Sequence, residues 1–144
     1  MLACDMIVAA DGAKFTAAYV KAGLTPDGGL THALSRLLPR QMAMEMCLLG
    51  RSYTASRLAE LGVISQICPK DQALKTALEL VEPLLFGPSQ TQARIRTLMS
   101  QAANTDLETQ LDLEADAMAE AQGSREAAEG ISAFFEKRTP DYSI

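Results

Sequence analysis

Side chains that bind transition metals or form disulfides are scarce in this chain of 144 residues, which has three cysteines and one histidine. His32 has no cysteine or second histidine at ligand spacing, and the acidic residues of 105–121 fit a solvated helix face, so no metal site is predicted. Cys4, Cys47 and Cys68 are far apart and set among apolar neighbours. We therefore expect buried free thiols in a reducing compartment.

Blocks of basic residues and long apolar segments are absent as well. No stretch holds five or six consecutive Lys or Arg residues and the formal net charge is -5, so nucleic acid is not an expected partner. No apolar run approaches the ~18 residues of a membrane span, and the N-terminus lacks the regions of a signal peptide. These absences predict a soluble, cytoplasmic protein that binds a small molecule or another protein, with no membrane partner.

Apolar material is plentiful, at 48% of the residues, which is enough for the core of one domain. An apolar, β-branched run at residues 4–10 predicts a buried strand that ends at Asp11 and Gly12. A free domain rarely starts inside its own core, and few strands do not make a stable sheet. The early strand therefore predicts a fragment whose neighbouring strands belong to other sequence.

Helical periodicity dominates the rest of the chain. It predicts helices at 30–38 and 42–49, then a third that Thr54 or Ser56 caps and that ends near Gly62, before a strand at 63–68. Further helices are expected near residues 70–86, 88–103, 105–121 and 124–137, with Thr105 and Glu108 forming a capping box. The expected fold class is α/β, with strands in residues 1–68 and a mainly helical region in residues 69–144.

One turn is a candidate for chemistry. The segment Thr25-Pro26-Asp27-Gly28-Gly29 places a carboxylate beside two glycines and a predicted helix N-terminus, where backbone N–H groups approach a ligand closely. The residues alone leave a simpler alternative open, in which Asp27 caps the helix and the glycines only turn the chain.

The turn belongs to a series of short segments that occur in a fixed order along the chain: residues 3–10 (ACDMIVAA), 13–15 (AKF), 20–29 (VKAGLTPDGG), 34–38 (LSRLL), 48–55 (LLGRSYTA), 59–64 (AELGVI) and 129–140 (EGISAFFEKRTP). This ordered series resembles the C-terminal half of the crotonase family of enoyl-CoA hydratases and isomerases. The resemblance implies a crotonase/ClpP-like spiral of β-β-α units followed by a helical trimerisation region, and hence a homotrimer or hexamer. It also implies acyl-CoA thioesters as substrates, with coenzyme A part of the substrate and no separate cofactor.

Carried over residue by residue, the resemblance assigns Asp27 as the general base or proton shuttle. Classical hydratases have a catalytic glutamate eight positions earlier, where this chain has Tyr19, so an isomerase is favoured over a two-glutamate hydratase. The pattern Val-Lys-x-Gly-Leu-x-Pro-Asp-x-Gly most resembles the epoxide-acyl-CoA isomerases of phenylacetate breakdown. Tyr19, Pro26, Gly28 and Gly29 are expected in the substrate pocket.

Two residues near the end of the chain, Phe134 and Lys137, match positions that in the family contact the CoA nucleotide of a neighbouring subunit. The family has roughly a hundred residues, a domain-sized piece, before the first segment matched, and these include both backbone donors for the thioester oxygen. The resemblance therefore implies a truncated form that is inactive in isolation. Two alternatives stay open: a non-catalytic helical oligomerisation module that pairs with crotonase paralogues, and an unrelated helical binding protein.

Overall fold

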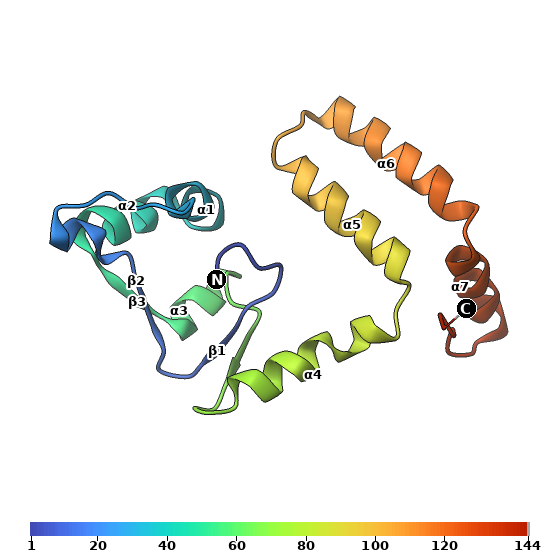
Figure 1. The fold of residues 1–144 in the computed structure, drawn as a ribbon, viewed down its shortest axis with the longest axis horizontal. Helices are drawn as coiled ribbons and strands as arrows, with labels where there is room; N and C mark the ends of the chain where they lie inside the picture. The colour runs from blue at the N-terminus through green and yellow to red at the C-terminus, as the bar shows by residue number, and fades with distance from the viewer. Residues whose placement is uncertain (144) are drawn as a thin grey trace. The chain divides into compact units, whose positions relative to one another are not determined.

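The computed structural model describes residues 1–143, which divide into two compact units, Met1–Leu80 and a second unit from Val81 onward. The first unit holds every strand assigned in the described residues, and the second is helical. A few strands followed by helices is the order that the sequence predicted, and that fold class is confirmed (Figure 1). No helix within residues 1–143 combines the length and apolar character that a membrane crossing requires.

Two short sheets frame the first unit. Strand β1 (Val8–Ala10) pairs in parallel with β4 (Gln66–Cys68), whereas β2 (Lys14–Thr16) pairs antiparallel with β3 (Ser52–Thr54). Each sheet has two strands. A parallel pair of strands needs a long crossover connection. Between β1 and β4 this connection is residues 11–65, which contain the turn that carries Asp27.

Both strands expected from the sequence are shorter than predicted. The strand expected at residues 4–10 begins only at Val8, and Cys4 and Asp5 before it are exposed. The strand expected at residues 63–68 begins only at Gln66. Val63 precedes it in the turn after Gly62, where its amide donates to the carbonyl of Leu58 at 2.9 Å. The apolar residues Val63 and Ile64 lie in the core although they belong to a turn. An apolar run in the sequence does not by itself distinguish such a buried turn from a buried strand.

The cysteines are free thiols, as expected, but they are not all buried. Cys68 is buried and its Sγ lies 3.5 Å from the carbonyl oxygen of Ala9, Cys47 is half-buried, and Cys4 is exposed. The prediction for Cys4 was wrong because that residue precedes the strand instead of lying in it.

Three helices and a short 3-10 helix, η1 (Ala18–Ala22), belong to the same unit; α3 contacts β3 and β4, while η1 and α1 contact α2. Helix α1 (Leu30–Leu37) is followed directly by α2 (Arg40–Leu49) after Pro39, and α2 ends at Gly50 in the left-handed conformation. Helix α3 (Ala55–Glu60) is capped by Thr54, whose side chain accepts from the amide of Arg57, as predicted. The core consists of Ile7, Ala9, Ala17, Leu34, Leu38, Met46, Ala55, Leu58, Val63 and Ile64.

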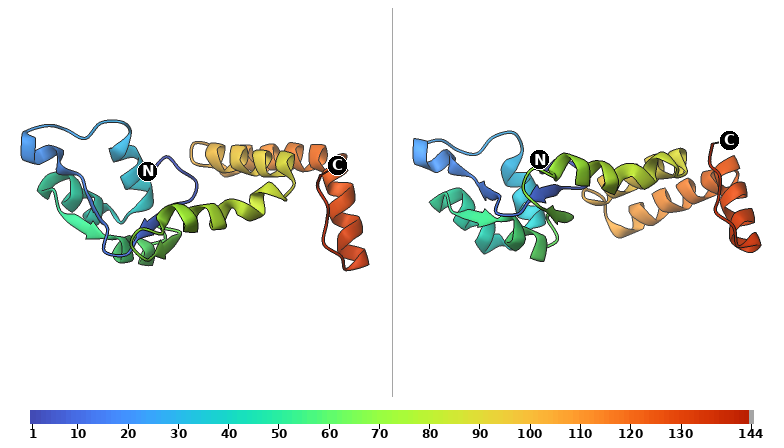
Figure 2. Two further views of the ribbon diagram at one scale, coloured as in Figure 1. Left: turned by 60° about the horizontal axis from the view of Figure 1, so that its bottom comes forward. Right: turned by 90° about the horizontal axis from the view of Figure 1, so that it is seen from below.

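The boundary between the two units falls within helix α4 (Ala73–Leu85), and the second unit also contains α5 (Ser89–Ala102), α6 (Leu107–Gln122) and α7 (Arg125–Glu136). Helices α5 and α6 run side by side in all three views (Figures 1 and 2). All four agree within a few residues with the predicted helices.

The cap of α6 differs from the predicted capping box. Asp106 is the N-cap and accepts from the amide of Thr109 at 2.8 Å, whereas Thr105 donates to Gln110 Oε1 at 2.9 Å. An ionised Asp is a strong cap because its carboxylate accepts hydrogen bonds from the unpaired amides of the first turn, and its negative charge interacts favourably with the positive end of the helix dipole. These hydrogen bonds from Thr109 hold the pKa of Asp106 below its ordinary value.

A carboxylate from another helix caps α5. Glu126 on α7 accepts from the amides of Gln90 at 2.8 Å and Thr91 at 2.9 Å, and from the hydroxyl of Thr91. Partial desolvation raises the pKa of Glu126, but these hydrogen bonds outweigh it and the net pKa lies below the ordinary value. The side chain thus joins α5 to α7, because the first-turn amides of α5 have no partner inside their own helix.

Arg138 closes the end of α7. Its two terminal nitrogens donate to the two carboxylate oxygens of Glu129, at 2.5 and 3.0 Å, and its Nε donates to Glu136. The amide of Asp141 also donates to Glu129, at 2.8 Å. The Arg138 guanidinium and this amide lower the pKa of Glu129 from 4.5 to about 2.

This shift makes the C-terminal end of α7 sensitive to acid. Because the folded-state pKa of Glu129 lies below its unfolded value, its stabilising contribution is present above pH 4.5 and is lost as the pH falls toward 2. Urea unfolding measured at several pH values from 7 to 2 gives the free energy of unfolding as a function of pH. This free energy should fall less on acidification in Glu129→Gln than in the unchanged protein. The same change at exposed Glu82 should leave the pH dependence as it is, and equal behaviour of the two variants would contradict the pairing.

Candidate functional site

A pocket of about 600 Å³ opens in the first unit beside the turn singled out in the sequence. Its wall is formed by Met1, Leu2, Ala3, Phe15, Thr16, Ala17, Tyr19, Asp27, Gly28, Gly29, Leu30, His32, Ala33, Leu34, Leu38, Met46, Leu58 and Val63. Most of these side chains are apolar, and Asp27 is the one carboxylate among them. A concave apolar wall with few polar groups is the usual form of a small-molecule site.

Backbone geometry places Asp27 at the edge of this pocket. The two residues that follow, Gly28 and Gly29, both have positive φ, at 58° and 79°. L-residues with a side chain rarely adopt two such conformations in succession. The glycines therefore allow the sharp turn by which the chain passes from Asp27 into α1, whose first amide, from Leu30, donates to the Asp27 carbonyl at 3.0 Å.

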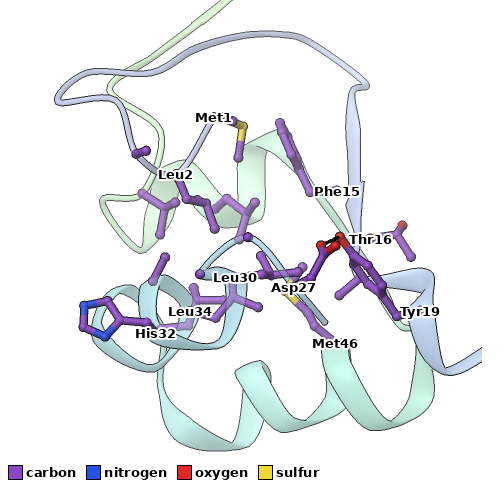
Figure 3. A pocket seen from close by; sticks show the side chains of 18 residues that line it. Met1, Leu2, Phe15, Thr16, Tyr19, Asp27, Leu30, His32, Leu34 and Met46 are labelled. Carbon is purple, nitrogen blue, oxygen red and sulfur yellow. Dashed lines mark hydrogen bonds between the residues drawn. The ribbon is translucent and has the colours of Figure 1, made fainter. Parts of the chain in front are cut away.

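The carboxylate of Asp27 does not cap α1. Gly29 occupies the N-cap position and contributes no side-chain hydrogen bond. Asp27 Oδ1 instead accepts from the hydroxyl of Tyr19 at 2.8 Å, as Figure 3 shows. The simpler alternative from the sequence, in which Asp27 caps the helix and the glycines turn the chain, is therefore only partly right. The glycines do form the turn, but the Asp27 side chain is directed across the loop to η1 and caps no helix.

The contact with Asp27 also changes the acidity of Tyr19. Its hydrogen bond to the carboxylate, followed by the nearby negative charge, raises the pKa of the phenol above its ordinary value of 10. The Tyr19 hydroxyl therefore keeps its proton throughout the neutral range and acts as a donor.

The helix that carries Tyr19 is held against the end of α2. The side chain of Lys21 passes over Gly50, where an added Cβ would lie 2.7 Å from Lys21 Cε. Gly50 also has a φ of 58°. The positive φ favours glycine at this position, and the contact between η1 and α2 places Tyr19 near the end of α2.

This arrangement suits proton transfer rather than metal binding. An exposed carboxylate beside an apolar wall can take a proton from a bound molecule and return it. His32 also lines the pocket, but Figure 3 shows its ring turned away from Tyr19 and Asp27. Within residues 1–143, no group of three or more His, Cys, Asp or Glu side chains is placed to hold a metal ion.

The structure brings four of the residues proposed from the sequence together. The same pocket is lined by Tyr19, Asp27, Gly28 and Gly29. Pro26, which precedes Asp27, is half-buried and is not part of the pocket wall. The apolar wall itself was not predicted as a site. Its members, such as Leu34 and Leu58, read in the sequence as ordinary core residues, and no local signal separates the two roles.

Phe134 and Lys137 belong to the second unit. Phe134 is 79% exposed and its ring meets Phe135 edge-on with 5.8 Å between centroids. Lys137 is exposed at the end of α7 with a positive φ of 55°. An exposed cation and an exposed aromatic ring suit contact with a nucleotide, and this role stays a prediction.

Comparison with known proteins agrees over the whole described length. The sequence model of a family described as enoyl-CoA hydratase/isomerase matches residues 1–143. The 1,2-epoxyphenylacetyl-CoA isomerase of Escherichia coli (strain K12) is 37% identical over 139 residues, which is 96% of this chain and 53% of that protein. The 2,3-dehydroadipyl-CoA hydratase of the same organism is 33% identical, covering 98% of this chain and 55% of the relative.

Solved structures give the same result for the fold. An enoyl-CoA hydratase from Polaromonas sp. JS666 superposes with a TM-score of 0.94 at 37% identity, over 97% of this chain and 55% of that one. A protein described as enoyl-CoA hydratase subunit I from Geobacillus kaustophilus superposes with a TM-score of 0.94 at 26% identity. The chain thus spans about half the length of the relatives that it matches.

Proposed function

The chain belongs to the enoyl-CoA hydratase/isomerase (crotonase) family, and on that premise we propose that it contributes Asp27 as the acid/base of an acyl-CoA isomerase. The observation that carries the proposal is the pocket in which Asp27 is the one carboxylate and Tyr19 is its partner. The Polaromonas structure at 37% identity is named as a hydratase, whereas the Escherichia coli relative with the same identity over 139 residues is named as an isomerase. This name supports aromatic acyl-CoA thioesters, such as those of phenylacetate degradation, as the substrate class.

One carboxylate is enough for an isomerisation. Asp27 takes a proton from the carbon next to the thioester carbonyl, so that the electron pair moves onto the thioester oxygen as an enolate. The now neutral carboxylic acid returns the same proton at a carbon further along the conjugated system, and the carbonyl re-forms. Hydration has a further requirement, since water must be activated as well as a proton delivered. A site with one carboxylate and one neutral phenol is therefore better suited to moving a proton.

Stabilising the enolate requires donors aimed at the thioester oxygen. Because the chain spans about half the length of its relatives, we propose that these 144 residues alone bind a thioester weakly and do not turn it over. We assign contact with the CoA nucleotide to Phe134 and Lys137, whose aromatic ring and ammonium group are both exposed.

A second candidate function is an oligomerisation module without catalysis, pairing with crotonase paralogues. It is favoured by the large apolar side chains exposed on the helices of the second unit, among them Ile95, Met99, Leu111, Met118 and Phe134. Such residues suit burial between subunits. The same surface is compatible with a catalytic homotrimer or hexamer, so activity decides between the two functions.

Two substrates that differ only in the double bond test the proposal on the native gene product, with all the segments that it carries. With 3-hexenoyl-CoA, an isomerase moves the double bond into conjugation and the ultraviolet absorbance of the enoyl thioester rises. With 2-hexenoyl-CoA, a hydratase removes the conjugation and the absorbance falls. We expect isomerisation to be faster by at least about tenfold, equivalent to about 1.4 kcal/mol in the barrier. Faster hydration would refute the assignment as an isomerase. No turnover of either substrate by a gene product longer than these 144 residues would favour the module.

A further inference from the structure

The carboxylate of Asp27 has two oxygens in different surroundings. Oδ1 accepts the Tyr19 hydroxyl at 2.8 Å. Within residues 1–143 this hydroxyl is the one hydrogen-bond donor to the carboxylate, so Oδ2 accepts no hydrogen bond from these residues. The side chain is otherwise exposed on a glycine turn, where a carboxylate without a partner would rotate freely between rotamers.

We infer that Tyr19 is the positioning residue of Asp27, holding Oδ1 through its hydroxyl and so presenting Oδ2 to the pocket as the atom that takes and returns the proton. The inference rests on the proposed role of Asp27 and adds to it a second residue and a choice of oxygen. A reacting oxygen held in one orientation avoids the entropic cost of orienting it in each turnover.

Chemistry also makes a phenol suitable for this role. When Oδ2 takes the proton, Oδ1 remains an acceptor, so the hydrogen bond from Tyr19 persists through both protonation states of Asp27. A second carboxylate in place of the phenol would repel Asp27 and would compete for the proton. Tyr19 therefore orients the carboxylate without entering the proton transfer.

The chain contains a matched pair outside the site. Tyr53 donates to Glu45 Oε2 at 2.5 Å, across the same sequence separation of eight residues as between Tyr19 and Asp27. Glu45 differs in having a second partner, Arg51, and neither Tyr53 nor Glu45 lines the pocket. This second tyrosine-carboxylate pair joins α2 to β3 and provides an internal control.

Kinetics of the native gene product with 3-hexenoyl-CoA separate positioning from a structural effect. Tyr19→Phe should lower kcat by at least about tenfold, the factor that corresponds to about 1.4 kcal/mol, and should change KM by less than about twofold because binding is retained. Tyr53→Phe should leave both constants unchanged. If Tyr19→Phe behaves like Tyr53→Phe while Asp27→Asn is inactive, the inference fails and the proposed function stands. Retained activity in Asp27→Asn would overturn both.

A second measurement does not depend on activity. In protein labelled with ¹³C-tyrosine, the ring signals that Tyr19→Phe removes belong to Tyr19, and they should titrate with a pKa above the ordinary value of 10 because of the hydrogen bond to Asp27. Asp27→Asn should move this pKa down toward 10, since the negative charge is gone. A Tyr19 pKa that is identical in the two proteins would show that the pair is not formed in solution and would overturn the inference.

Discussion

Replacing Asp27 with asparagine should lower kcat for isomerisation by about two to four orders of magnitude, the range that general acid-base catalysis contributes. Asparagine keeps the shape of the side chain and can still accept the Tyr19 hydroxyl, but its amide cannot take a proton at neutral pH. The effect should therefore appear in kcat, with KM and the far-ultraviolet circular dichroism almost unchanged. Steady-state kinetics with 3-hexenoyl-CoA provide the measurement.

The matched control for this prediction is Asp116→Asn. Asp116 is exposed on α6 in the second unit and lines no part of the pocket, so the same chemical change there should leave turnover as it is. If the two variants lose activity equally, the loss does not arise from proton transfer. If neither loses activity, Asp27 is a residue of the turn and nothing more.

Truncating Leu58 to alanine should destabilise the first unit by about 2–5 kcal/mol, the range for large-to-small changes in a well-packed core. Leu58 is 2% exposed, its carbonyl accepts the amide of Val63, and its side chain forms part of the inner wall of the pocket. The cost combines lost burial with the cavity left behind. The midpoint of urea unfolding, followed by circular dichroism, measures it.

Leu74→Ala is the corresponding surface change in the same unit. Leu74 is 75% exposed on α4, so its truncation should alter the free energy of unfolding by no more than about 0.5 kcal/mol. Equal destabilisation by the two substitutions would contradict the core position of Leu58. A large effect of Leu74→Ala alone would mean that another surface covers Leu74 in solution.

Local signals in the sequence predicted the helices well and the strands poorly. Pro39, Gly50 and Thr54 mark helix boundaries by restricting φ, permitting a left-handed residue or capping free amides, and each acts where it was predicted to act. Strands depend on partners far away in sequence, so the apolar runs at residues 4–10 and 63–68 indicated burial without showing where pairing begins. β2 and β3 were missed altogether, because three residues carry too little periodicity to identify a strand.

The sequence by itself determined the family, the order of the elements and the position of Asp27 on a glycine turn, because each of these is written in short segments of neighbouring residues. Only the tertiary structure decided what Asp27 contacts. The residues of the Tyr19–Asp27 pair are eight apart with no continuous helix between them, so their hydrogen bond depends on how η1 packs against α2. The pocket wall likewise gathers side chains from Met1 to Val63. A hydrogen bond and a cavity require several segments to meet in space, and hydrophobic packing of the whole unit brings them together.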